Sequence, residues 1–146
     1  MEQLNVFLAV PISSCANVDE YDKLRRAIMD LLGTLRGKGF QVFSEVEQIV
    51  DESGYEPPGD TVKKDFGKID QSHVFILFHP RKMQSSTLIE LGYAYAKEKK
   101  IIIISRRDDL PYMACGFPDA RDNTTIIESE TLDTATISKI INLLNE

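Results

Sequence analysis

The sequence predicts an α/β fold in which a parallel sheet lies between layers of helices, and two observations support this prediction. Five short segments are apolar at almost every position, which is typical of strands buried on both faces of a parallel sheet. Segments with apolar residues at helical spacing separate these strands along the chain. The predicted strands are Leu4–Val10, Phe40–Phe43, His73–Phe78, Lys100–Ser105 and Thr124–Ile127.

The predicted helices begin and end at local sequence signals. Asn17, with Glu20 three residues later, has the spacing of a capping box and starts the first helix, which ends near Gly37 and Gly39. Asp60 or Thr61 is expected to cap the second helix. This second helix is predicted to run to about Gln71, and two further helices to cover about 86–99 and 132–145. An acidic loop is predicted at 45–59 and an irregular segment at 106–123.

A chain of 146 residues predicts a single domain that covers positions 1–146. Five strands of this kind favour a flavodoxin-like three-layer sandwich with the strand order 2-1-3-4-5. In such a sheet the ligand binds beyond the carboxyl ends of the strands, at the switch between strands 1 and 3. The loops that reach this edge are Pro11–Asn17, His79–Thr87 and the segment from Ser105 onward.

Composition and missing motifs exclude several classes of function. A net charge of −6 argues against a nucleic-acid polymer as the partner, and no basic run exceeds two residues. No stretch approaches the ~18 apolar residues of a membrane span, and the amino terminus lacks the positive charge of a signal peptide, so we expect a cytoplasmic protein. Neither GxxxxGK[ST], GxGxxG after the first strand, nor GxSxG occurs, and the two cysteines and two histidines have no metal-binding spacing. We therefore expect no cofactor and no metal.

The segment Ser85–Gly92, with the sequence SSTLIELG, places a glutamate among apolar residues where a strand leads into a helix. Glu90 has two interpretations. Thr87 and Glu90 have the spacing of a capping box, which spacing alone favours. The alternative is a catalytic carboxylate, acting as a nucleophile or as a general acid and base at the ligand edge of the sheet.

Hydroxyl residues occur in two of the loops at this edge. Ser13 and Ser14 follow the first strand, and Ser85 and Ser86 precede the helix that carries Glu90. Serine hydroxyls beside the free N–H groups of a helix start can hold an anion such as a phosphate. The alternative is that these serines only cap helices and form turns.

Asp65, on the predicted helix before the third strand, is the candidate partner of Glu90. Two carboxylates on either side of a glycosidic carbon can break that bond with retention, one as the nucleophile and the other managing protons or orienting the sugar. The alternative is a surface charge among the neighbouring lysines, which is the commoner arrangement.

The run DFGKIDQSHVFILFHPRKMQSSTLIELGYAYAKEKKIIII, residues 65–104, resembles the core of the nucleoside 2-deoxyribosyltransferase family. This family includes 2'-deoxynucleoside 5'-phosphate N-hydrolases and CMP-type N-hydrolases. The opening segment VFLAVPIS resembles the first strand and loop of the family, and Pro111–Met113 and Asn123–Ser129 match its late segments. The most specific part of the resemblance is the ELGYA block together with Asp65.

The resemblance implies a flavodoxin-like enzyme, a homodimer or larger homo-oligomer, that hydrolyses or transfers at the N-glycosidic bond of a (deoxy)nucleoside or its 5'-monophosphate. Glu90 matches the family's nucleophile, which forms a glycosyl-enzyme intermediate, and Asp65 matches its second carboxylate, which contacts the sugar or assists departure of the base. The expected substrate-binding residues are Phe7, Pro11, Ser13, Ser14, Ser85, Ser86, Met113 and Asn123, and the four serines are expected at the 5'-phosphate.

Some positions depart from the family pattern. Phe7 stands where the family often has a tyrosine, Ser13 where nucleotide-specific members have an arginine, Ser86 where a glycine is usual, and His73 where an aspartate is usual. These departures leave two alternatives open. One is a nucleotide-binding or sensing domain of the same fold that has no turnover. The other is a TIR-like NAD hydrolase, which shares the alternating architecture and a catalytic glutamate.

Overall fold

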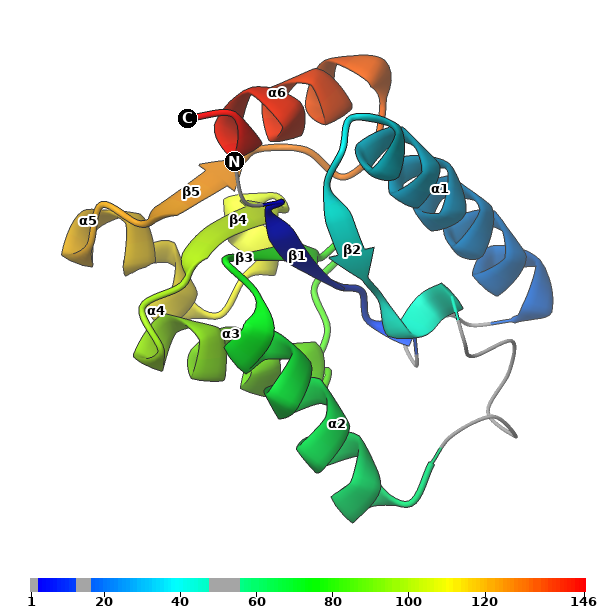
Figure 1. Ribbon diagram of the computed structural model, residues 1–146, viewed down its shortest axis with the longest axis horizontal. Helices are drawn as coiled ribbons and strands as arrows, with labels where there is room; N and C mark the ends of the chain where they lie inside the picture. Colours follow the sequence, from blue (N-terminus) through cyan, green and yellow to red (C-terminus); the bar gives the residue numbers. More distant parts are fainter. Residues whose placement is uncertain (1–2, 13–16, 48–55) are drawn as a thin grey trace.

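The protein folds around a five-stranded sheet whose strands are all parallel (Figure 1). The structure is a computed structural model and describes residues 3–12, 17–47 and 56–146. The strand order β2-β1-β3-β4-β5 confirms the predicted flavodoxin-like arrangement. The strands are β1 (Asn5–Ala9), β2 (Gln41–Phe43), β3 (Val74–Phe78), β4 (Lys100–Ile104) and β5 (Thr124–Ile127).

The central strand β3 is buried along its whole length, as its uniformly apolar sequence predicts. Phe75 of β3 is paired with Phe7 of β1 on one side and with Ile101 of β4 on the other. The predicted strands are confirmed, and their bounds differ from the observed ones by one residue at most. Such differences are normal at the ends of elements, where the ladder hydrogen bonds stop.

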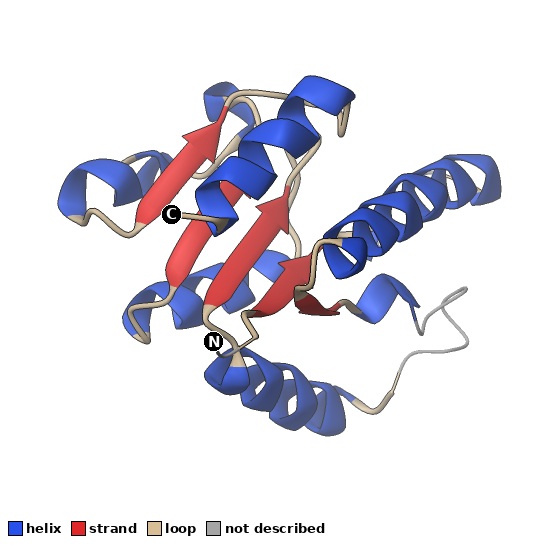
Figure 2. Ribbon diagram, turned by 45° about the horizontal axis from the view of Figure 1, so that its top comes forward, coloured by secondary structure: helices blue, strands red, loops and turns tan. Residues whose placement is uncertain are grey.

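Helices cover both faces of the sheet, so that Figure 2 shows the strands between two helical layers. The first and last long helices start at side-chain caps: Asn17 Oδ1 accepts from the Glu20 N–H at 2.9 Å, and Asp133 Oδ1 accepts from the Thr136 N–H at 2.8 Å. The helices of the described residues are α1 (Val18–Gly37), α2 (Pro58–Gln71), α3 (Thr87–Ala96), α4 (Tyr112–Cys115), α5 (Phe117–Ala120) and α6 (Thr134–Leu144), with 3-10 turns η2 (Glu45–Glu47) and η4 (Arg107–Asp109).

Two segments predicted as loops contain short helices. The predicted loop at 45–59 begins with η2, and α2 begins at Pro58 rather than at Asp60 or Thr61. Proline is favourable in the first turn of a helix because its missing N–H has no partner there anyway. The same effect applies to α5, which has Pro118 in its first turn, whereas α4 begins directly after Pro111, its N-cap residue. From the sequence, these prolines predicted only irregular segments, and the short helices that begin at or next to them were not predicted.

The two faces of the sheet carry separate apolar cores. Helices α1 and α6 cover one face, and α2 and α3 cover the other (Figure 1). Alternate strand residues point to opposite faces, so Val6 and Leu8 pack under α1 and α6 while Phe7 and Ala9 pack under α2 and α3. Among the helices of the described residues, none combines the length and the apolar character needed to cross a membrane.

Candidate active site

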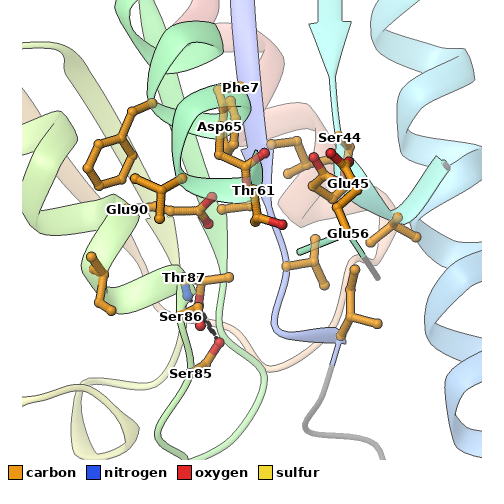
Figure 3. Close-up of a pocket in the computed structure, with 18 of the residues that line it drawn as sticks. Phe7, Ser44, Glu45, Glu56, Thr61, Asp65, Ser85, Ser86, Thr87 and Glu90 are labelled. Carbon is orange, nitrogen blue, oxygen red and sulfur yellow. Dashed lines mark hydrogen bonds between the residues drawn. The ribbon is translucent and has the colours of Figure 1, made fainter. Parts of the chain in front are cut away.

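A cavity of ≈ 350 Å³ lies at the edge of the sheet where β1 ends, on the side of α2 and α3. Its walls come from the end of β1, from the turn after β2, from α2 and from the loop that leads from β3 into α3 (Figure 3). This is the edge that the parallel-sheet rule selects. The polar residues that line the cavity are Ser44, Glu45, Glu56, Thr61, Asp65, Ser85, Ser86, Thr87 and Glu90, and its apolar wall includes Phe7, Ala9, Val10, Ile12, Val62, Phe66 and Ile89.

Glu90, in the first turn of α3, lines this cavity rather than capping the helix. The residue before α3 is Ser86, which makes no side-chain cap, and the Thr87 N–H donates instead to Ser85 Oγ at 3.1 Å. The capping-box interpretation is therefore wrong. Burial is the main cause that raises the pKa of Glu90 to about 7; the hydrogen bond with Asp65 lowers it, and the nearby Glu45 charge contributes to the increase.

Asp65, on α2, is only 6% exposed and lines the same cavity as Glu90. The alternative that it is a surface charge is therefore wrong, even though lysines flank it in sequence. Burial raises the pKa of Asp65 to about 6; a hydrogen bond with Glu45 lowers it, and the Glu90 carboxyl raises it. Among the described residues Asp65 Oδ1 has no hydrogen-bond partner. The two candidate carboxyls are thus coupled to each other inside one cavity.

A third carboxyl, Glu45, belongs to the same cluster and was missed by the sequence-based reasoning. It follows β2 directly, in η2, and lies within ion-pair distance of Lys64, with Oε1 3.0 Å from Nζ. Burial raises the pKa of Glu45 to about 7, and its hydrogen bond with Asp65 adds to the effect. The signal that could have found it is its position immediately after strand 2, at the ligand edge; its place in an acidic loop obscured that signal.

The hydroxyl residues at the start of α3 form a compact group. The hydroxyls of Ser85 and Thr87 are 2.9 Å apart, and both residues line the cavity together with Ser86. Ser13 and Ser14, expected in the same site, lie outside the described residues. Of the two loops expected to hold an anion, the structure therefore describes the hydroxyl residues at the start of α3 alone.

Phe7 is 1% exposed and contributes to the cavity wall from β1. Its ring is stacked on that of Phe75 at 5.5 Å and tilted against that of Phe43 at 5.4 Å. Phe7 therefore supplies an apolar surface where a tyrosine would supply a hydroxyl. Pro11, which is buried just beyond the end of β1, is not among the residues that line the cavity.

Two expected substrate-binding residues lie away from the cavity. Met113 is on α4 and is 77% exposed. Asn123 precedes β5, so it lies at the amino edge of the sheet, where its Nδ2 donates to the Lys99 carbonyl at 2.8 Å. Both were matched by their order along the chain, which does not determine the edge of the sheet that a residue reaches. Neither residue is among those that line this cavity.

The arrangement combines coupled carboxyls with a helix start that carries hydroxyls. Among the described residues, no group of three histidines, cysteines, aspartates or glutamates is placed to hold a metal ion. A carboxylate that can attack carbon, a second carboxyl beside it and N–H and hydroxyl donors nearby suit the cleavage of a glycosidic bond in an anionic substrate. By fold and by this grouping the chain is similar to nucleoside 2-deoxyribosyltransferase-like proteins.

Solved structures support that resemblance. The chain is similar to a CMP N-glycosidase of Clostridium botulinum, BcmB, with 25% identity, a TM-score of 0.64 and 97% of each chain covered. It also shares the fold of a conserved protein from Enterococcus faecalis V583, with 16% identity, a TM-score of 0.69 and 97% and 99% of the two chains covered. A third similar structure is BlsM, with 18% identity, a TM-score of 0.65 and 97% and 94% covered. No protein-family model and no curated protein sequence matches the chain.

Proposed function

We propose that this protein hydrolyses the N-glycosidic bond of a nucleoside 5'-monophosphate, with Glu90 as the nucleophile. The observation that carries the proposal is the meeting of Glu90 and Asp65, from two different helices, in one cavity at the ligand edge of the sheet. The likeness to a CMP N-glycosidase over 97% of both chains supports the same reaction class. Transfer of the sugar to a second base is the related reaction that the same intermediate would allow.

In this reaction an ionised Glu90 attacks the anomeric carbon C1' as the bond to the base breaks. The carboxylate displaces the base and forms a glycosyl ester, which water then hydrolyses with overall retention. Asp65 stabilises the ionised Glu90 through their hydrogen bond and contacts the sugar. Because burial raises the pKa of Glu90 to about 7, we expect the rate to fall as the pH drops below about 7.

The start of α3 is the proposed site for the 5'-phosphate. The first N–H groups of a helix carry partial positive charge and lack partners within the helix. Ser85 and Ser86 add hydroxyl donors at this point, and both line the cavity that contains Glu90. A phosphate bound here would place the sugar of the same nucleotide beside the two carboxyls.

The test is a panel of ribo- and deoxyribonucleosides and their 5'-monophosphates, with release of free base followed by chromatography. We expect base release from at least one monophosphate and slower release from the corresponding nucleoside. Failure of the folded protein to release base from any member of the panel would contradict the proposal. Turnover of NAD, included in the same panel, would instead favour the TIR-like alternative.

A second candidate function, nucleotide binding without turnover, is favoured by Phe7. Its ring occupies the cavity wall where a hydroxyl could orient the nucleophile. This function predicts that a nucleoside monophosphate raises the melting temperature and is recovered intact from the protein. Recovery of free base from the same incubation would exclude it. The expected homo-oligomer and cytoplasmic location stay predictions, and light scattering tests the first of them.

A further inference from the structure

Glu45 lies on the part of the cavity wall that the proposed phosphate and sugar sites leave unused. The sheet order places β2, which leads into Glu45, on one side of β1, and β3, which leads into Ser85 and Ser86, on the other. In Figure 3, Glu45 and Ser44 come from the side of the cavity away from Ser85 and Ser86. The Asp65 and Glu90 side chains point into the space between these two sides. A nucleotide with its phosphate at the serines and its sugar at Glu90 would direct its base toward Glu45.

Polar atoms on this wall lack partners in the protein. Ser44 is 1% exposed, lines the cavity, and its Oγ has no hydrogen-bond partner among the described residues. Asp65 Oδ1, in the same cavity, is also without one in the part of the chain that the structure describes. Leaving a buried polar atom unpaired costs about 1–3 kcal/mol, so such atoms at a cavity wall favour a polar partner, either water or a ligand group. A nucleobase edge carries the donors and acceptors that would pair them.

The charges around Glu45 favour a proton held in the cavity. From α2, Asp65 and Lys64 face it; Glu56 precedes α2, and Glu90 comes from α3. One ammonium, that of Lys64, pairs with both Glu45 and Glu56. Glu45, Asp65 and Glu90 lie in one cavity, and burial and the like charges of the neighbouring carboxyls favour their neutral acid forms. For Glu45, burial is the largest of the causes that raise its pKa to about 7.

We propose that Glu45 is a further catalytic residue of the proposed reaction, the general acid that protonates the departing base. This inference rests on the proposed function. As the C1'–N bond breaks, its electron pair passes to the base nitrogen, and the Glu45 carboxyl gives its proton to the base. A Glu90 oxygen forms the new bond to C1', so the base leaves as a neutral molecule.

The second half of the reaction restores both glutamates. A water molecule enters the space that the base has left, and its oxygen bonds to C1' while the ester bond to Glu90 breaks. The bonding pair returns to the Glu90 carboxylate, and the proton of the water passes to the Glu45 carboxylate. One water is consumed, and one base and one sugar phosphate are released.

The test compares two leaving groups in the Glu45→Gln variant. One substrate is the nucleoside monophosphate that the wild-type protein cleaves fastest, and the other is 4-nitrophenyl β-D-ribofuranoside 5-phosphate, whose nitrophenolate departs without a proton. We expect kcat for the nucleotide to fall about 100-fold with little change in KM, because general acids contribute a factor of this size. We expect kcat for the nitrophenyl substrate to fall less than about fivefold. The alkaline fall in kcat/KM should also disappear for the nucleotide.

The matched control is Glu47→Gln, the same change in the same short helix. Glu47 does not line the cavity and is paired with Arg36 instead, so both activities should stay within about twofold of the wild type. An equal loss on both substrates, or a higher KM with an unchanged kcat, would overturn the role of Glu45 while leaving the proposed function intact. A Glu90→Ala variant that keeps its activity would overturn the proposed function, and a wild type that cleaves neither substrate would overturn both.

Discussion

The two faces of the sheet are built on different principles. Under α1 and α6 the core is closed and apolar, and Ile28, Leu31, Leu32 and Leu35 are fully buried along one side of α1. Under α2 and α3 the core is equally apolar at its centre, but at its edge it opens into a cavity. That edge carries three partly or fully buried carboxyls whose pKa values burial raises.

The comparison separates a face that stabilises the fold from a face that carries the candidate active site. Apolar side chains that fill a face stabilise the fold through removal from water and close packing. Buried carboxyls that face one another do the opposite, because each must lose hydration and approach a like charge. Such a cluster is commoner at functional sites than elsewhere. Substitutions on the two faces should therefore change different measured quantities.

The largest expected effect is on activity, from the carboxyl face. Glu90→Ala should lower base release by about 10³-fold or more, because no other group would supply the attacking oxygen. The free energy of unfolding should stay the same or rise, since the variant loses a buried carboxyl. Chromatography of the released base and thermal melts of the same sample check both parts. A variant with unchanged activity would contradict the role given to Glu90.

The next effect is on stability, from the closed face. Leu32→Ala should lower the free energy of unfolding by about 2–5 kcal/mol, since it leaves a cavity among fully buried side chains. Activity per folded molecule should stay at the wild-type value. Denaturant titration measures the first quantity, and Leu32→Met, which keeps the volume, is the control. If Leu32→Ala instead reduced activity in the folded protein, the separation of the two faces would not hold.

A smaller effect concerns the start of α3. Ser85→Ala removes a hydroxyl from a residue that lines the cavity. We expect KM for the monophosphate to rise by about tenfold, because the variant loses one hydrogen bond to a charged phosphate. The corresponding nucleoside has no phosphate, so its KM should hardly change and serves as the control. Equal changes for both substrates would place the phosphate elsewhere.

The smallest effect is the dependence of stability on pH. In the folded protein the pKa values are raised to about 7 for Glu45, about 6 for Asp65 and about 7 for Glu90. At pH values between the ordinary carboxyl pKa and these raised values, the folded state therefore binds more protons than the unfolded state. Stability should therefore fall as the pH rises from about 5 to about 8, by about 1 kcal/mol or more. Melting temperatures of Asp65→Asn should show a shallower fall. A wild-type melting temperature that rises over this range would contradict the carboxyl cluster.

The sheet could be predicted from the sequence because its strands are largely apolar segments, which are stable only when they are buried in the interior. The edge rule then brought Glu90, Ser85 and Ser86 to the cavity. Spacing alone misjudged Glu90 and Asp65, because a capping box and a charged helix surface use the same residues. Glu45 was missed because its environment depends on contacts with Lys64 and Asp65 of α2. More than ten residues without a clear hydrophobic pattern separate Glu45 from α2, so the sequence does not indicate these contacts. Asn123 does not line the cavity, because order along the chain does not determine which edge of the sheet a residue reaches.

The central claim is that the carboxyl face performs nucleophilic chemistry through Glu90. The most direct measurement is mass spectrometry of the protein after brief incubation with a nucleoside monophosphate that carries fluorine at C2'. Fluorine there slows hydrolysis of the glycosyl ester because it destabilises positive charge developing at C1'. We predict that the protein gains the mass of the fluorinated sugar phosphate and that the peptide containing Glu90 carries it. Release of base with no adduct on the protein, or with the adduct on Asp65 or Glu45, would contradict the claim.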